Sequence, residues 1–403
     1  MTEPLPLLFL RDADLYDPAP RGRCDLLLGG GRILAVGPKL DAPTSSLCAS
    51  LELGGATVTP GLVDAHVHVT GGGGEAGYAS RVPALQLTEL SLAGVTSVVG
   101  LLGTDGTTRT MRDLVARTYA LREEGLSAWC WTGNYQVPVR TLTGSVRDDI
   151  AFVQPVIGVG ELALSDHRSS QPTFDELVRI AADCHVGGLM TGKAGILHLH
   201  LGDGARGLQL VRRALAETEL PARVFHPTHL NRNATLFDEA CELARTLAPE
   251  RRPCFDLTAF PAGEVGEGRS AADAIASWFR EGLPPERLTC SSDGGGCMPR
   301  FDASGTPVGY GVGSATTLFD TIREAIDRHG LQLAQVLPVF TRNVADLLRL
   351  PAKGRLRAGA DADLLVLDAQ RRPTTVIARG RVLVRDGAPL VRGPFETADA
   401  PRP

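Results

Sequence analysis

The amino-acid sequence predicts an α/β protein: a (β/α)8 barrel of the TIM type with a small β-domain formed from both chain ends. Apolar or β-branched runs recur at intervals of roughly 28 to 40 residues, the length of one strand–helix unit. Amphipathic stretches fill most of the gaps between these runs, and further short strand-like segments cluster at both ends of the chain. Strands that alternate regularly with helices are best explained by a closed parallel barrel.

The predicted barrel strands are short apolar runs bounded by turn residues. They are Leu62–Val69, Thr96–Leu102, Ser127–Gly133, Val156–Leu164, Ile196–Gly202, Arg223–His229, Cys254–Phe260 and Leu288–Asp293. The predicted helices carry apolar residues at helical spacing and are often followed by a glycine, as at Gly125 and Gly282. They are Pro83–Ala93, Met111–Glu124, Phe174–His185, Leu208–Thr218, Ala234–Leu247, Ala271–Glu281 and Thr316–His329.

The two ends of the chain read differently from the middle. Their short strands are Leu7–Leu10, Leu26–Leu28, Ile33–Val36 and Ser50–Leu53, then Asp363–Leu367, Thr375–Ala378 and Val382–Arg385. Neither set is large enough to form a stable sheet alone. We therefore expect residues 1–58 and 351–397 to pair into the small β-domain, and residues 59–350 to form the barrel.

Composition excludes several classes of protein. The net charge of −5 and the absence of a Lys/Arg run argue against a nucleic-acid or membrane partner. Eight scattered cysteines without a close CxxC pair are typical of reduced core residues. The first residues carry an acid and no basic segment, which argues against a secretory signal, so a cytoplasmic enzyme is expected.

The strongest chemical signal is His66-Val67-His68 on the first predicted barrel strand. Residues i and i+2 of a strand face the same side, so both imidazoles point into the barrel mouth. An isolated His-x-His motif is usually a pair of core or capping histidines. Here His200, His229 and Asp293 end three further strands, on the face where barrel enzymes place their catalytic groups. Four imidazoles and a carboxylate suit zinc or a similar divalent ion.

This ligand pattern resembles the metal site of the amidohydrolase superfamily, and Gly359–Leu364 is similar to the stretch that re-enters its small β-domain. Within the superfamily the chain most resembles the isoaspartyl (β-aspartyl) dipeptidases. The matching stretches are Gly71–Gly77, Thr96–Thr104, Ser165–Arg168, Thr228–Asn233 and Ser291–Gly294. The resemblance covers nearly the whole chain and implies hydrolysis of the isopeptide bond of a β-aspartyl dipeptide by a metal-activated hydroxide.

The resemblance also implies a bridging acid on the fourth strand, where many members carry a carboxylated lysine. This strand has no lysine. Counting back from Ser165 places Glu161 at the bridging position, whereas counting forward from Gly158 places Gly160 there. Glu161 offers two oxygens to two zinc ions, but its short stem requires a shift of the strand, such as a bulge near Gly160. A single-metal site is the alternative.

Further roles follow from the resemblance. Asp293 is expected to accept the proton of the attacking water and to hand it to the leaving amine. Tyr135 is expected to donate a hydrogen bond to the developing oxyanion. Its ordinary alternative is a half-buried structural tyrosine.

Five residues are expected to bind substrate. Glu75 is the candidate for the free ammonium group, and Arg168 and Arg232 are the candidate forks for two carboxylates. Thr104 follows the second strand. Cys297 stands where the family commonly has serine, and a thiol is the weaker hydrogen-bond donor. The departures at Glu161 and Cys297 concern the choice of substrate more than the reaction type.

The leading hypothesis is therefore a binuclear zinc dipeptidase that assembles as a homo-oligomer. The alternative is another amidohydrolase, acting on a cyclic amide or an N-acyl amino acid, which would have no need of Glu75. A barrel without activity would be expected to lose ligands. His198 is expected to face the same way as His200 but deeper in the barrel, whereas His185, His226 and His329 are expected in helices or the core.

Overall fold

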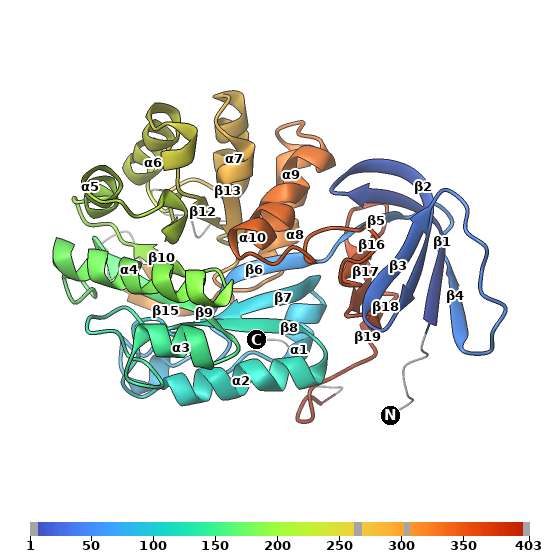
Figure 1. Cartoon of the computed structure of the whole chain (residues 1–403), viewed down its shortest axis with the longest axis horizontal. Helices are drawn as coiled ribbons and strands as arrows, with labels where there is room; N and C mark the ends of the chain where they lie inside the picture. The colour runs from blue at the N-terminus through green and yellow to red at the C-terminus, as the bar shows by residue number, and fades with distance from the viewer. Residues whose placement is uncertain (1–6, 262–267, 302–306, 398–403) are drawn as a thin grey trace.

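The computed structural model describes residues 7–261, 268–301 and 307–397 (Figure 1). The chain forms a mixed α/β fold in which a curled parallel sheet carries helices on its outer side. A second, largely antiparallel sheet lies beside it, at the right of Figure 1. The parallel sheet carries the functional side chains described below.

The parallel sheet has the order β11-β10-β9-β8-β7-β6, and β12 and β13 pair separately, also in parallel. The strand bounds are β6 Leu62–Val67, β7 Val95–Gly100, β8 Ser127–Thr132, β9 Val156–Leu164, β10 Ile196–Leu201, β11 Phe225–Thr228, β12 Phe255–Thr258 and β13 Leu288–Ser291. All eight predicted strand segments are present in the predicted order. A parallel bridge between Val67 and Gly294 joins the end of β6 to the segment that follows β13.

The helices lie between successive strands. Their bounds are α1 Leu87–Ser91, α2 Met111–Glu124, α3 Val146–Phe152, α4 Phe174–Thr191, α5 Gln209–Glu217, α6 Ala234–Thr246, α7 Ala271–Arg280, α8 Thr317–Asp327, α9 Leu333–Phe340 and α10 Arg342–Leu347. Short 3-10 turns occur at Tyr78–Ser80, Ala222–Val224, Pro249–Arg251 and Pro285–Arg287. Polar N-caps begin several helices, for example Thr110, whose hydroxyl accepts a hydrogen bond from Asp113 N.

The second sheet combines strands from both ends of the chain. Its order is β19-β18-β17-β16-β5-β1-β2-β3, with β4 also paired to β1. The bounds are β1 Leu7–Asp17, β2 Ala19–Gly29, β3 Arg32–Gly37, β4 Cys48–Glu52, β5 Thr57–Pro60, β16 Leu364–Leu367, β17 Pro373–Ala378, β18 Arg381–Arg385 and β19 Ala388–Pro389. The two ends meet where β16 runs antiparallel to β5, with Leu364 opposite Pro60. Strand β5 spans the boundary predicted at residue 58.

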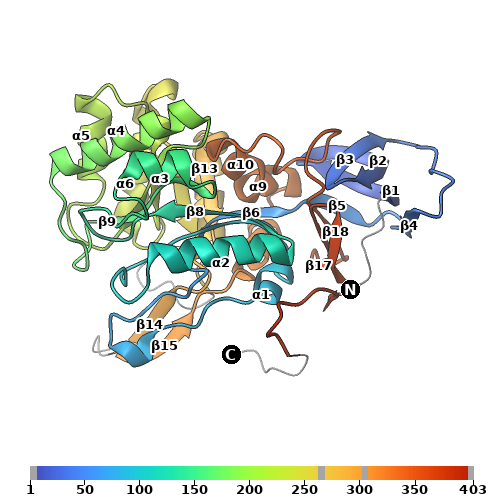
Figure 2. The same ribbon diagram turned by 60° about the horizontal axis from the view of Figure 1, so that its bottom comes forward.

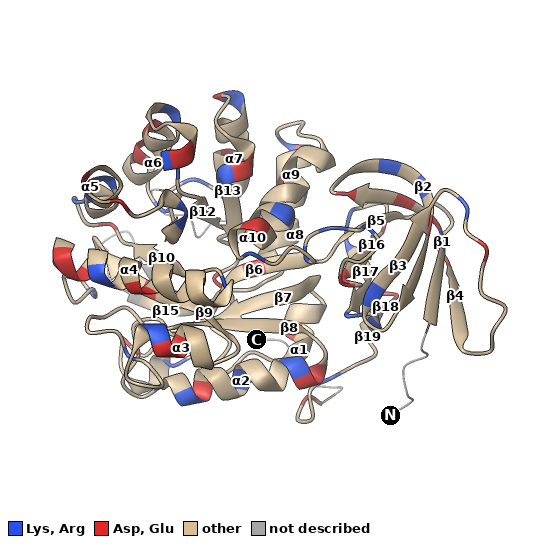
Figure 3. Cartoon of the chain, viewed as in Figure 1, with Lys and Arg blue, Asp and Glu red and all other residues tan. Residues whose placement is uncertain are grey.

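An antiparallel hairpin, β14 Cys297–Phe301 with β15 Pro307–Val312, follows β13 and projects from the parallel sheet in Figure 2. In the view of Figure 3, Lys, Arg, Asp and Glu alternate along the outer helices, and the parallel strands carry few of them. Within the described ranges, no helix is both long enough and apolar enough to cross a membrane.

Candidate metal centre

All six predicted metal ligands converge at the carboxyl ends of the parallel strands. His66 lies in β6 and His68 directly after it, Glu161 in β9 and His200 in β10. His229 follows β11 and Asp293 follows β13. The four histidines and Glu161 are buried, and the Asp293 side chain is 17% exposed. The shared edge of a parallel sheet therefore gathers ligands that lie as far apart as positions 66 and 293.

The two oxygens of Glu161 face different sets of ligands. Its Oε1 lies 3.5 Å from Nε2 of His66 and 3.5 Å from Nε2 of His68. Its Oε2 lies 3.0 Å from Nδ1 of His200 and 3.5 Å from Nε2 of His229. Asp293 joins the first set, because its Oδ1 lies 3.4 Å from His66 Nε2 and 3.1 Å from His68 Nε2.

Strand β9 has the irregularity expected for a glutamate at this position. Leu197 and Leu199 of β10 pair with Val159 and Leu162, so the β9 segment holds one residue more than its partner. The expected bulge near Gly160 is therefore present. A Cβ on Gly160 would lie 2.9 Å from the Cβ of His198. Glu161, not Gly160, is the β9 residue that reaches the cluster.

The spacing of these atoms fits divalent cations. Zinc binds nitrogen and oxygen ligands at about 2.0–2.2 Å, so tetrahedral neighbours around one ion lie roughly 3.3–3.6 Å apart. The distances of 3.0 to 3.5 Å between the facing ligand atoms are close to that spacing. Among the described residues, His66 Nε2 and Asp293 Oδ1 are buried without a hydrogen-bond partner. Buried polar atoms of this kind require a partner, and a cation supplies one.

Both carboxylates are in the form that binds cations. Burial pushes the pKa of Glu161 up, but the charge of His66 and hydrogen bonds from His200 and His229 outweigh it and hold that pKa well below its usual range. Burial likewise opposes ionisation of Asp293, whose pKa is nevertheless lowered by His66 and His68. The cluster therefore pairs two negative charges with four imidazoles.

Three of the four histidines have a partner on their second ring nitrogen. His66 Nδ1 lies 2.8 Å from His198 Nε2, and His229 Nδ1 lies 2.7 Å from the hydroxyl of Thr258. His200 Nε2 lies 2.9 Å from Oδ2 of Asp166. Such partners hold a ligand ring in one orientation and tautomer.

Asp166 lies within the matching stretch Ser165–Arg168, but the sequence did not indicate a role for it. Besides the contact with His200, it accepts two hydrogen bonds from the Arg168 guanidinium, at 3.0 Å from Nε and 2.7 Å from Nη2, and a third from the Arg168 backbone N–H. Burial opposes its ionisation, but His200 and Arg168 lower its pKa below the usual range. Asp166 therefore links a proposed metal ligand to a proposed substrate fork. A carboxylate two residues before that arginine was the available signal.

Most of the predicted substrate residues surround the cluster. Arg168 Nη1 donates to Glu75 at 3.3 Å, and Arg232 Nη1 donates to the carbonyl of Leu201 at 2.9 Å and lies 3.4 Å from His200 Nε2. The Tyr135 hydroxyl lies 2.9 Å from His200 Nδ1. Burial and the nearby Glu161 raise the Tyr135 pKa well above its usual value, so the phenol keeps its proton.

The remaining two predicted substrate residues differ in their surroundings. Cys297 begins β14 beside the glycine loop, since a Cβ on Gly73 would lie 3.0 Å from the Cys297 Cβ. Burial and the charge of Glu75 raise the pKa of its thiol to about 11. Thr104 follows β7, and its described hydrogen bonds do not reach the other substrate residues.

The backbone at the site adopts unusual conformations. Ser165, His229 and Asp293 have φ angles of 53°, 63° and 54°, a region that residues other than glycine seldom occupy. Such conformations persist where the surrounding structure enforces them, and they gather at functional sites. Two of the three are proposed metal ligands.

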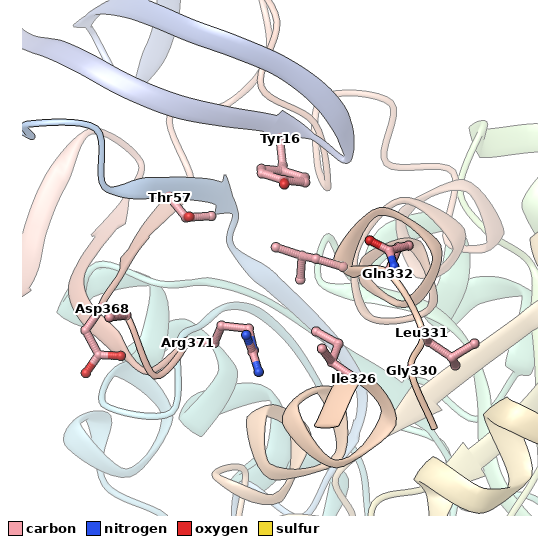
Figure 4. A pocket seen from close by; sticks show the side chains of 10 residues that line it. Tyr16, Thr57, Ile326, Gly330, Leu331, Gln332, Asp368 and Arg371 are labelled. Atoms are coloured by element: carbon pink, nitrogen blue, oxygen red, sulfur yellow. The ribbon is translucent and has the colours of Figure 1, made fainter. Parts of the chain in front are cut away.

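A separate cavity of about 410 Å³ lies between the second sheet and the α8–α9 helix pair (Figure 4). It is lined by Tyr16 and Thr57 of the second sheet, by residues of α8 and α9, and by Asp368 and Arg371. None of the proposed metal ligands is among the lining residues. The cavity is therefore distinct from the histidine cluster.

Comparisons with known proteins agree with the site. A family profile described as "Amidohydrolase family" matches residues 57–383. The crystal structure of β-aspartyl dipeptidase from Fervidobacterium islandicum AW-1, in complex with β-Asp-Leu dipeptide, is similar with a TM-score of 0.87 and 39% identity, covering 95% of this chain and 98% of that chain. N-isopropylammelide isopropylaminohydrolase from Burkholderia multivorans, at 19% identity and a TM-score of 0.62 over 95% of this chain and 100% of that one, shares the fold.

Among curated proteins the similarity is weaker. Imidazolonepropionase of Pseudomonas paraeruginosa is 34% identical over 70 residues, which is 17% of each chain. That of Paracoccus denitrificans is 23% identical over 366 residues, 85% of this chain and 87% of the relative. The profile match and the extended similarity to a solved dipeptidase carry the assignment. This chain belongs to the amidohydrolase superfamily and, within it, to the isoaspartyl (β-aspartyl) dipeptidase family.

Proposed function

We propose that this protein is a metal-dependent hydrolase that cleaves the isopeptide bond of β-aspartyl dipeptides. The observation that carries the proposal is the 39% identity, over 95% of the chain, to a β-aspartyl dipeptidase solved with β-Asp-Leu. The convergence of four histidines and two carboxylates at one edge of the sheet supports it independently.

Two zinc ions per chain are proposed as the cofactor. His66, His68 and Asp293 would hold one ion, His200 and His229 the other, and Glu161 would bridge them through its two oxygens. When bound, such ions lower the pKa of water and polarise a carbonyl group. The donor set of imidazoles and carboxylates is one that zinc accepts.

Two side chains are proposed to move or hold protons. Asp293, whose Oδ1 has no hydrogen-bond partner, accepts a proton from the attacking water and transfers it to the leaving amine. Tyr135, which keeps its phenolic proton, donates a hydrogen bond to the carbonyl oxygen as negative charge develops there.

The surrounding charges suit a β-aspartyl dipeptide, which carries one free ammonium group and two free carboxylates. Glu75 is proposed to bind the ammonium group, and Arg168 and Arg232 the carboxylates. Thr104 and Cys297 are proposed as further contacts. Glu75 and Arg168 form an ion pair with each other in the described structure. Substrate binding would replace that ion pair with two others, one between Glu75 and the ammonium group and one between Arg168 and a carboxylate.

The larger organisation is proposed on the same basis. The parallel strands would close into a (β/α)8 barrel over residues 59–350, and residues 1–58 with 351–397 would form the small β-domain. The pairing of β5 with β16 and a separate apolar cluster that includes Leu26, Val58 and Leu364 support this division. A homo-oligomer located in the cytoplasm is proposed as the working form.

The test is hydrolysis of β-Asp-Leu against α-Asp-Leu, with divalent metal measured on the same sample. Turnover of the β-linked peptide alone, with about two metals per chain, is the expected result. A fully metallated protein that cleaves neither peptide would contradict the dipeptidase activity and direct the search to cyclic amides and N-acyl amino acids.

A further inference from the structure

A buried row of hydrogen-bonding groups lies behind the metal cluster. His66 Nδ1 is 2.8 Å from His198 Nε2, and His198 Nδ1 is 2.9 Å from His226 Nδ1. His226 Nε2 is in turn 3.0 Å from the hydroxyl of Thr289, which donates to Asp256 Oδ1 at 2.6 Å. The side chains of all five residues are fully buried, so water does not compete for these contacts.

Asp256 determines which group donates and which accepts in each hydrogen bond along this row. The hydroxyls of Thr228 and Ser291 donate to its Oδ2, each at 2.6 Å, and Thr289 donates to its Oδ1. A carboxylate oxygen accepts hydrogen bonds, and three hydroxyl donors surround this carboxylate. Thr289 has a single hydroxyl proton, which it gives to Asp256. Its oxygen must therefore accept the next hydrogen bond, from Nε2–H of His226.

A neutral imidazole has one donor nitrogen and one acceptor nitrogen, so the direction passes along the row. Burial lowers the pKa of His226 to about 4, which keeps that ring neutral and makes its Nδ1 an acceptor. His198 must then donate from Nδ1 and accept at Nε2. His66 must donate from Nδ1, so in the neutral ring that binds a cation the lone pair is on Nε2.

We infer that Asp256, Thr289, His226 and His198 are positioning residues that fix the tautomer of His66 and aim its Nε2 lone pair at a metal ion. His66 Nε2 faces Oε1 of Glu161 at 3.5 Å and Oδ1 of Asp293 at 3.4 Å. With the ring neutral and its lone pair on Nε2, His66 can meet these two acceptors only through a cation. The inference rests on the metal-binding part of the proposed function and adds residues that the ligand pattern does not contain.

Packing holds the His198 ring in place within the row. The indole of Trp131 stacks on the His198 ring, with centroids 5.4 Å apart and an interplanar angle of 18°. Gly160 leaves room for this stack, since a Cβ there would lie 3.0 Å from Trp131. His68 Nδ1, in contrast, has no hydrogen-bond partner among the described residues, so the row orients one histidine of the pair.

The decisive comparison is Thr289→Val against Thr289→Ser. Valine keeps the shape of threonine but removes the hydroxyl, whereas serine keeps the hydroxyl and loses the methyl group. Zinc affinity is measured by chelator competition, together with metal content after dialysis. The inference predicts that Thr289→Val weakens one of two metal sites by about 10–100-fold and that Thr289→Ser keeps it. A packing role predicts the opposite order.

A second pair keeps the test decisive if a Thr289 variant does not fold. In His198→Gln the amide oxygen can accept from His66 and the amide nitrogen can donate to His226, whereas His198→Leu can do neither. The glutamine variant is expected to bind zinc more tightly than the leucine variant. His185→Leu, on α4 and outside the row, is the matched control and should bind zinc like the wild-type protein.

The outcomes separate the two claims. A wild-type protein that binds zinc, with Thr289→Val equal to Thr289→Ser and His198→Leu equal to His198→Gln, would overturn the inference and leave the proposed function standing. A wild-type protein that binds no divalent metal would overturn both.

Discussion

Glu161 contacts the ligands of both proposed metal positions. A glutamate has one side-chain carboxylate, yet its two oxygens each lie within 3.5 Å of two different histidines. Two cations on opposite sides of such a group share its negative charge and offset the cost of burying it. Because the carboxylate is intrinsic to the side chain, no lysine modification is needed for a bridge.

Asp293 is predicted to transfer a proton as well as to bind a metal ion. Asp293→Asn keeps an oxygen ligand but removes the base, so turnover should fall by about 10²–10⁴-fold while metal content stays close to the wild-type value. Parallel measurement of kcat and of metal by mass spectrometry checks this. Full activity in a metallated Asp293→Asn protein would refute the assignment of the base.

Substitutions of Asp166 and of Arg168 should have different effects on zinc affinity and on KM. Asp166→Asn weakens the partner of His200 Nε2 and the fork of Arg168 together, so zinc affinity should fall by about 10–100-fold and KM should rise. Arg168→Met should raise KM with little effect on zinc affinity. If Asp166→Asn changes KM alone, its contact with His200 does not orient a ligand.

Among single residues, the sequence could predict which side chains gather at the cluster but not the residues that support them. His66, His68, His200, His229 and Asp293 follow from strand ends and side-chain alternation, both of which are local properties. The contact between His198 and His226, and that of Asp166 with His200, depend on which strands become neighbours and in what register. A local pattern does not contain that information.

Among the elements, β9 departs most from regular geometry in order to form the site. Its extra residue places Glu161 at the cluster while Gly160 packs against Trp131 and His198. The predicted bounds of β9 agree with the observed ones, because the nine-residue run contains a single charged residue, Glu161, and is followed by a polar motif. The bulge was expected from the short glutamate stem, a steric argument that did not need the fold.

Gly160→Ala should damage this strand and the site together. The added Cβ would lie 2.9 Å from the His198 Cβ and 3.0 Å from Trp131, so overpacking should lower the free energy of unfolding by about 1–3 kcal/mol. Metal affinity should fall as well. Gly309→Ala is the control, because no atom lies within 4 Å of a Cβ there. Chemical denaturation of both variants measures the difference, and equal stability would contradict the packing described.

The elements that the sequence did not predict have weak patterns. Helix α3 spans seven residues, too short to display a helical period. Helix α9 contains Pro338, which argues against a helix from sequence alone. Strand β5 has only four residues and ends at Pro60, too short to display an alternating pattern. Tertiary packing, rather than local preference, stabilises these elements.

Across the whole molecule, a buried lysine ties the segment that enters the second sheet to the parallel sheet. Lys353 Nζ lies 2.5 Å from Asp363, 2.8 Å from Asp361 and 2.6 Å from the hydroxyl of Ser127, at the start of β8. Its side chain is 4% exposed. The same lysine thus contacts both parts of the fold.

Lys353→Met should therefore destabilise the protein by about 3–5 kcal/mol, because it leaves the buried Asp363 without its cation. The double variant Lys353→Met with Asp363→Asn should recover part of that loss, since asparagine can still accept from Arg379 N. Denaturant titration of both proteins gives the comparison. A double variant less stable than Lys353→Met would show that the ion pair is not the cause.

We propose that Glu161 bridges two metal ions in a dipeptidase site. The measurement that tests it most directly is anomalous diffraction at the zinc edge from zinc-loaded crystals of this protein. Two anomalous peaks are predicted, one among His66, His68 and Asp293 and one between His200 and His229, each in contact with a different oxygen of Glu161. A single peak, or two peaks that Glu161 does not touch, would exclude a bridging role for Glu161.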